Sequence, residues 1–196
     1  MLKEAEQFTN SIEGECKLRF IILMKAGYHT DETLDEIIRR KIIEEKKCGV
    51  VYWGYNGVLC HPLNQVVPFV RKALEVGETP KLLLSVTSSK FQRERHIAKE
   101  YSTDGKNWFP FPSEALLTGC KYSLVCKNFR PVDFNLDLSR YRVSIGNSGG
   151  KLLTDYFKFR TDKACAMLDE TVEGEPKLIR VSYEAELVEP YAVFIR

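Results

Sequence analysis

The chain has no large charge of one sign, no long apolar run and no paired cysteine motif, and each absence excludes a class of protein. Its 196 residues carry a formal net charge of +2, whereas a protein dedicated to duplex DNA normally has a basic excess that displaces counterions from phosphates. No apolar run approaches the roughly 20 residues that a membrane-spanning helix needs. With 44% hydrophobic and 29% charged residues, the composition predicts a soluble globular protein with a substantial core and no membrane partner.

The cysteines are too sparse for a disulfide framework, and none of them forms a C-x-x-C pair. We therefore expect a reducing compartment. The N-terminal residues carry carboxylates where a signal peptide has cations, which favours a cytoplasmic location. A zinc site would have to draw four ligands from unrelated segments, so we expect no metal. The six positions are Cys16, Cys48, Cys60, Cys120, Cys126 and Cys165.

Known catalytic motifs are also missing. The chain contains no H-E-x-x-H and no G-x-S-x-G pattern. The turn at 146–151 resembles a phosphate-binding loop, but it has three residues where the Walker pattern has four, and Leu152 replaces the hydroxyl residue that would hold magnesium. We interpret it as a β-turn, and we expect no cofactor.

The first part of the chain predicts a strand followed by a helix. Residues 18–25 form a continuous apolar run, as in a strand that is covered on both faces. Thr30 or Asp31 is placed to cap the helix that follows, and Gly49 is placed to end it. The apolar stripe of this helix consists of Leu34, Ile37, Ile38 and Ile42. We interpret the opposite face, which mixes charges of both signs, as solvated: Asp35, Arg39, Arg40, Glu44, Lys46 and Lys47.

The alternation continues to residue 90. Residues 50–53 predict a second strand, 68–74 a helix that Gly77 ends, and 81–88 a third strand. The lengths of the intervening helical segments suit crossovers that make the three strands parallel.

The second half is mainly strand-like. Asp104-Gly105 lies between β-type flanks and predicts a hairpin. The clearest strand is 178–188, where apolar and polar residues alternate. Further strands are expected at 121–127, 141–145, 156–160 and 191–195, with a short helix at 163–168.

These elements predict an α+β fold: a βαβαβ-like N-terminal half followed by mainly antiparallel strands, in a mixed sheet or a partly closed barrel. We expect a single domain over residues 1–196, with an α/β-like lobe at 1–90 and a β-rich lobe at 91–196.

The carboxyl ends of the three parallel strands predict a binding site, because ligands in such sheets bind beside that edge. The loops there offer aromatic rings, hydroxyls, an amide, imidazoles and an ammonium, which suit a planar polar ligand such as a nucleotide. A competing interpretation makes Trp53 and Tyr55 half-buried strand aromatics. The predicted ligand-binding residues are Tyr28, His29, Thr30, Trp53, Tyr55, Asn56, His61, Ser88, Ser89 and Lys90.

Three functions fit these residues. The preferred hypothesis is a non-catalytic binding protein for a nucleotide-like small molecule, or for an unstacked base of a single-stranded nucleic acid. The first alternative is an enzyme acting on such a ligand with His61, His29 or Cys60. The second is an adaptor that contacts a protein partner through Trp108 and the Phe-Pro repeat at 109–112, in the loop from Trp108 to Pro112.

Overall fold

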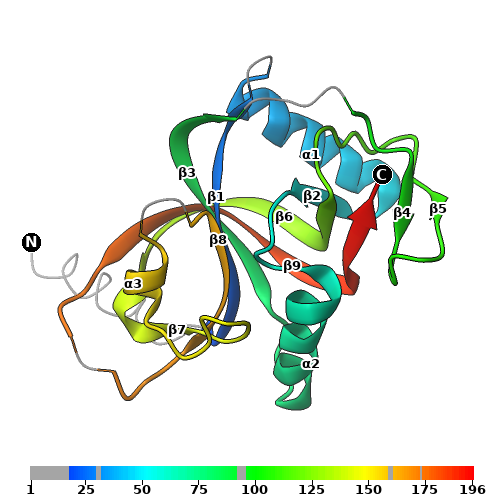
Figure 1. Cartoon of the computed structure of the whole chain (residues 1–196). Coiled ribbons are helices and arrows are strands. Elements are labelled where there is room, and N and C mark those ends of the chain that lie inside the picture. The colour runs from blue at the N-terminus through cyan, green and yellow to red at the C-terminus, as the bar shows by residue number, and fades with distance from the viewer. Residues whose placement is uncertain (1–17, 30–31, 92–95, 159–160, 173) are drawn as a thin grey trace, which may run out of the picture.

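The structure is a computed structural model that describes residues 18–29, 32–91, 96–158, 161–172 and 174–196. It has an α+β fold with one mixed sheet (Figure 1). The helical elements are α1 (Leu34–Cys48), the π-helix η1 (Pro62–Val66), α2 (Val67–Glu75), the 3-10 helix η2 (Leu138–Arg140) and α3 (Leu153–Tyr156). The strands are β1 (Phe20–His29), β2 (Val51–Tyr55), β3 (Lys81–Phe91), β4 (Glu100–Ser102), β5 (Phe109–Pro110), β6 (Tyr122–Asp137), β7 (Tyr141–Val143), β8 (Lys163–Leu168) and β9 (Leu178–Ile195).

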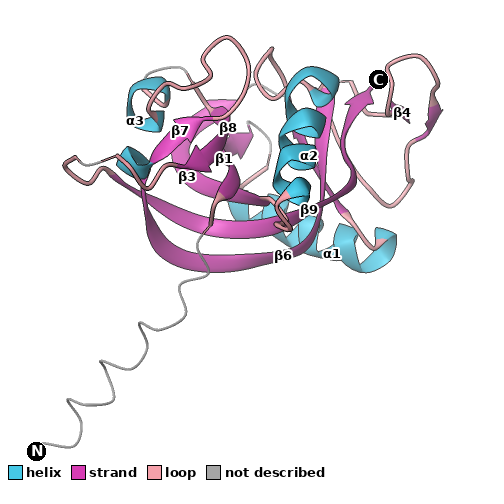
Figure 2. Cartoon of the chain, turned by 90° about the horizontal axis from the view of Figure 1, so that it is seen from below, coloured by secondary structure: helices cyan, strands magenta, loops and turns pink. Residues whose placement is uncertain are grey.

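The sheet has the strand order β2-β6-β9-β3-β1-β8-β7, and the β4–β5 hairpin joins it through the end of β9. β1 and β3 are parallel, and the other pairings in the described part of the chain are antiparallel. β6 and β9 are long and strongly curved, and they sweep across the molecule side by side (Figure 2). The curvature brings β2, at one end of the strand order, back toward β1.

The predicted set of three parallel strands is wrong in its middle member. β1, α1, β2, α2 and β3 do follow one another along the chain, but β2 pairs antiparallel with β6 instead of lying between β1 and β3. β1 has β3 on one side and β8 on the other, so both of its edges are occupied. The apolar pattern of a strand indicates that the strand is buried, but it does not identify the strand that pairs with it.

Two local predictions in the second half are also wrong. Residues 163–168 form β8 instead of a helix, although alanine, methionine and leucine favour helices. Their position between β1 and β7 supplies ladder partners on both sides and overrides that preference. The strand expected at 156–160 is absent as far as residue 158: Leu153–Tyr156 form α3, and residues 159–160 lie outside the described residues.

Helix α1 begins at a cap that the sequence analysis missed. Thr33, instead of Thr30 or Asp31, caps the helix, and its side chain and that of Glu36 form a reciprocal capping box. The predicted stop is confirmed: Gly49 has a left-handed φ of 71° and donates its amide to the Glu45 carbonyl.

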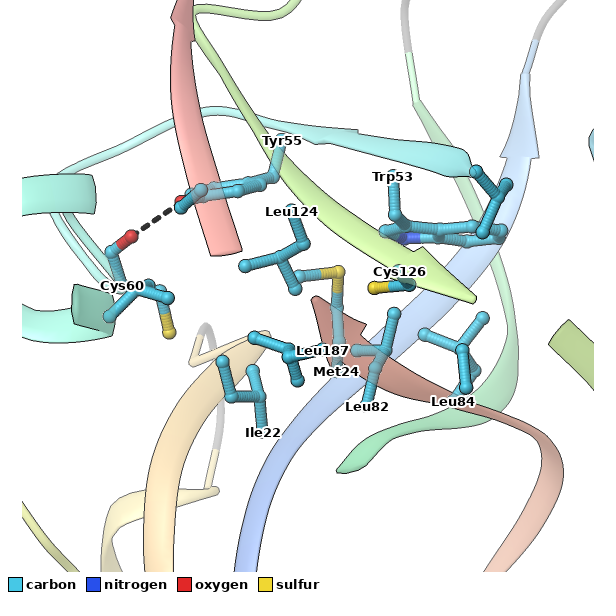
Figure 3. Close-up of a cluster of buried hydrophobic side chains, with 14 of the residues drawn as sticks. Ile22, Met24, Trp53, Tyr55, Cys60, Leu82, Leu84, Leu124, Cys126 and Leu187 are labelled. Carbon is cyan, nitrogen blue, oxygen red and sulfur yellow. Dashed lines mark hydrogen bonds between the residues drawn. The ribbon is translucent and has the colours of Figure 1, made fainter. Parts of the chain in front are cut away.

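Three groups of buried side chains surround the sheet. The first lies between the sheet and the helices α1 and α2, and Figure 3 shows Ile22, Met24, Trp53 and Leu124 within it. The second lies on the other face, under β7, β8 and α3. The third lies beneath the segment 111–120, which covers the outer side of β2. β6 and β9 contribute side chains to all three.

Candidate functional site

A cavity of about 260 Å³ lies where β1 and β2 end, between the inner face of α1 and the segment 116–120. Its apolar lining includes Met24, Leu34, Ile37, Trp53 and Leu117. Its polar lining includes Lys25, Arg40, Lys41, Asn56, Thr118 and Asp162. The C-terminal halves of β1 and β2 therefore line one cavity, although the two strands are not neighbours in the sheet.

Arg40 joins α1 to the far wall of this cavity. Its Nε and Nη2 donate to the two carboxylate oxygens of Glu32, each at 2.9 Å, and Nη1 donates to the Leu116 carbonyl at 2.8 Å. A guanidinium has five N–H groups in a fixed plane. These three bonds hold that plane in place and leave two N–H groups without a partner among the described residues.

Lys41 and Glu44 form an ion pair that is buried against β2. Their exposed fractions are 3% and 1%, and the lysine Nζ lies 2.9 and 3.2 Å from the two carboxylate oxygens. Nζ also donates to the Tyr52 carbonyl at 2.5 Å, while the Tyr52 amide donates to the Glu44 carboxylate at 2.6 Å. Burial lowers the pKa of Lys41, against the opposing effect of Glu44. The pair therefore closes the free edge of β2 at Tyr52.

Asn56 and Gly54 attach the segment 116–121 to the end of β2. The Asn56 amide donates to the Gly119 carbonyl and accepts the Lys121 amide at 2.9 Å. A Cβ added at Gly54 would lie 2.8 Å from the Cys120 Sγ, which is too close for a side chain. Only glycine allows the covering segment to lie this near to the strand.

Trp53 and Tyr55 line the cavity, although most of their surface is covered by protein. Their exposed fractions are 8% and 6%. The Trp53 ring stacks on Phe129 at 5.8 Å between centroids. The Tyr55 hydroxyl donates to the Cys60 carbonyl at 2.5 Å, and burial raises the pKa of Tyr55 well above its usual value. Both residues are thus core aromatics with one side at the cavity.

The indole nitrogen of Trp53 still reaches solvent. Among the described residues, Ser144 Oγ is the only buried side-chain nitrogen or oxygen without a hydrogen-bond partner. The Trp53 N–H forms no hydrogen bond within those residues and is not among the fully buried atoms. Trp53, which lines the cavity, therefore keeps a donor that no described residue uses.

The wall formed by the end of β1 carries charged groups. The Lys25 ammonium donates to the backbone carbonyls of Phe157 and Thr161 at 3.3 and 3.0 Å. Asp162 is paired with the buried Lys163 at 2.6 Å, and that ammonium lies 5.8 Å from the centre of the Tyr55 ring. Lys25 and Asp162 line the cavity here, and Lys163 lies buried behind Asp162.

Five further predicted residues lie at the ends of β1 and β3. The backbone of Tyr28 lies opposite Lys90, and that of His29 opposite Phe91. Ser88 and Ser89 belong to β3, so the backbones of these two strand ends lie side by side. Thr30 lies outside the described residues.

His61 and Cys60 lie away from the lining of the cavity. The His61 Nδ1 accepts the Asn64 amide at 3.4 Å, and the ring meets Tyr122 and Phe194 edge-on at 5.4 Å from each. The Cys60 Sγ is buried 3.8 Å from the Cys165 Sγ. His61 thus caps η1, and Cys60 is a core thiol.

The loop 108–112, the anchor of the adaptor hypothesis, is partly covered. The Arg196 guanidinium lies 4.0 Å above the Trp108 ring, and Phe111 is buried against Tyr52, with 4.8 Å between ring centres. Phe109 is 50% exposed. The predicted hairpin itself is confirmed, since β4 and β5 pair on either side of Asp104-Gly105.

Sequence analysis missed the contribution of α1 to the cavity. Arg40 and Glu44 were expected on the solvated face, but Arg40 is half-buried at the cavity and Glu44 is buried. Lys41 was not singled out. The signal was available: Ile37, Lys41 and Glu44 follow one another at helical spacings of four and three, so they share one face with the apolar stripe. A charged pair continuing an apolar stripe indicates a buried ion pair.

Comparisons with protein-family models, curated proteins and solved structures found no match for this chain. Within the described ranges, no helix combines the length and apolar character needed to cross a membrane. The same residues contain no group of three or more histidine, cysteine, aspartate or glutamate side chains arranged to hold a metal ion.

Proposed function

We propose that the chain is a binding protein without turnover, and that the cavity beside Trp53 holds the ring of a nucleotide-like small molecule. The observation that carries the proposal is the composition of the cavity wall: an indole, a fixed guanidinium with two available N–H groups, and strand backbone within about 260 Å³. Ligand pockets usually measure about 300–1,000 Å³. A volume just below that range suits a base or nucleoside, with any phosphate lying outside.

The bonding of the polar side chains favours binding over catalysis. Lys41 and Asn56 use their polar groups within the protein, so they shape the cavity and are not available for proton transfer. His61 and Cys60, which the enzyme alternative requires, are bonded or buried elsewhere. An unstacked base of a single-stranded nucleic acid would meet the same groups, and such a strand is the alternative source of the ring.

Fluorescence provides a direct test, because the chain has only two tryptophans. The Trp108→Phe variant leaves Trp53 as the single emitter, and Trp108 belongs to the β4–β5 loop instead of the cavity. We expect titration with nucleosides and nucleotides to change the emission of this variant saturably. If no nucleoside, nucleotide or short single-stranded oligonucleotide changes either the emission or the melting temperature, the proposal is wrong.

Filling part of the cavity tests where the ligand binds, and the same change on the protein surface is the control. Leu34→Phe adds volume at the cavity wall without removing a hydrogen bond, whereas Leu74→Phe makes the same change on the exposed side of α2. We expect the first variant to bind at least about tenfold more weakly, a difference of 1.4 kcal/mol, and the second to bind like the parent. Equal affinity in both variants would place the ligand elsewhere.

A further inference from the structure

The free edge of β2 carries main-chain groups directed away from the sheet. β2 pairs with β6 in an uninterrupted register from Val51 opposite Cys126 to Tyr55 opposite Tyr122. The amide and carbonyl of Tyr52 bond to Glu44 and Lys41, so they point away from β6. Successive residues of a strand direct their peptide groups to alternate edges. The amide and carbonyl of Gly54 must therefore point the same way as those of Tyr52.

Gly54 lacks the partners that Tyr52 has. It lines the cavity and is half-buried, and neither of its outward groups forms a hydrogen bond with the described part of the chain. The ion pair of α1 is fully engaged at Tyr52. Peptide groups removed from water normally have partners. Gly54 thus presents one donor and one acceptor, side by side, at the wall of the cavity.

We infer that the Gly54 amide and carbonyl form hydrogen bonds with the ligand and so select it. This inference rests on the proposed function. A ring with an adjacent donor and acceptor on one edge would bind to Gly54 as an added strand binds to a sheet edge. The Watson–Crick edge of a nucleobase has such a pair. The base enters with this edge toward Gly54, next to the Trp53 indole, and the sugar points outward.

Methylated nucleosides test the inference with matched pairs. 3-Methyluridine and N6,N6-dimethyladenosine lose the donor on the Watson–Crick edge of uridine and adenosine, while 5-methyluridine is altered on another edge. With the Trp108→Phe protein, whichever parent nucleoside binds should bind at least about tenfold more tightly than its edge-methylated form. The 5-methyl group should change the affinity of uridine less than about threefold.

The outcomes separate the two proposals. If nucleosides bind but methylation of the Watson–Crick edge leaves their affinity unchanged, Gly54 does not bind that edge. The inference is then wrong, and the proposed function stands. If no nucleoside binds, the proposed function fails first.

Amide hydrogen exchange checks the inference without assuming which nucleoside binds. In the free protein we expect the Gly54 amide to exchange much faster than those of Trp53 and Tyr55, which face β6, and to become protected when a binding nucleoside is added. A Gly54 amide that is as protected as its neighbours in the free protein would overturn the inference.

Discussion

Tyr52 and Gly54 lie two residues apart on the same free edge of β2. Within the described residues, the outward peptide groups of Tyr52 have hydrogen-bond partners, whereas those of Gly54 have none. At Tyr52, a buried lysine and glutamate of α1 supply an acceptor and a donor for the peptide groups. At Gly54, the same edge borders a cavity. Exposed strand edges are normally covered or paired. The edge is thus covered at Tyr52 and borders a cavity at Gly54, where we propose that a ligand binds.

The largest expected effect comes from disrupting the Lys41–Glu44 ion pair, which covers the edge of β2 at Tyr52. Glu44→Gln keeps the shape of the side chain but leaves the buried Lys41 ammonium without its counter-charge. Removing one partner of a buried pair typically costs about 3–5 kcal/mol, and we expect urea unfolding to show a loss of that size. The control is Glu75→Gln at the exposed end of α2, which should change stability by less than about 0.5 kcal/mol. Equal losses in both variants would mean that the pair does not seal the edge.

A smaller effect is expected on the open side. Gly54→Ala forces a Cβ to within 2.8 Å of the Cys120 Sγ and 3.1 Å of a Leu117 methyl carbon, and overpacking of this kind costs about 1–3 kcal/mol. Cys120→Ala removes the nearest atom, so the double variant should recover part of the loss. A double-mutant cycle of unfolding free energies should give a coupling of about 1 kcal/mol. Additive effects would show that the segment 116–120 moves away freely.

The smallest effect concerns alkaline pH and the ring of Tyr52, which lies beneath the segment 111–120. Burial raises the pKa of Tyr52 from 10.0 to about 12. Its neutral form is therefore favoured in the folded state, and this contribution is complete below pH 10 and is lost as the pH rises toward 12. Compared with Tyr52→Phe, the parent protein should lose extra unfolding free energy between pH 10 and 12. Parallel stability curves for the two proteins over that range would contradict the burial of the Tyr52 ring beneath the segment 111–120.

Local chemistry made several elements predictable. The apolar runs at 18–25, 50–53 and 81–88 each lie within or overlap an observed strand, and Gly49 ends α1 as expected. Three of the predicted ligand-binding residues, Trp53, Tyr55 and Asn56, line the cavity, and their binding of a ligand stays a prediction.

What was missed depends on contacts between distant segments. The partner of β2 is β6, about 70 residues further along the chain, and no pattern within 51–55 identifies it. Arg40 reaches the cavity wall only because the segment containing Leu116 folds over α1. His61 was predicted to bind ligand because it follows the Gly-rich stretch, but its ring packs against Tyr122 and Phe194, which lie far away in sequence.

The shared strands β6 and β9 tie the three buried groups to one another. Cys126 and Leu187 belong to the first group, Leu136 and Val181 to the second, and Val125 and Val193 to the third. Loss of order in any one group would strip neighbours from a strand on which the other two depend. We therefore expect the described body of the protein to melt as one cooperative unit, with a single calorimetric peak, and a substitution in any group to move that whole peak instead of splitting it.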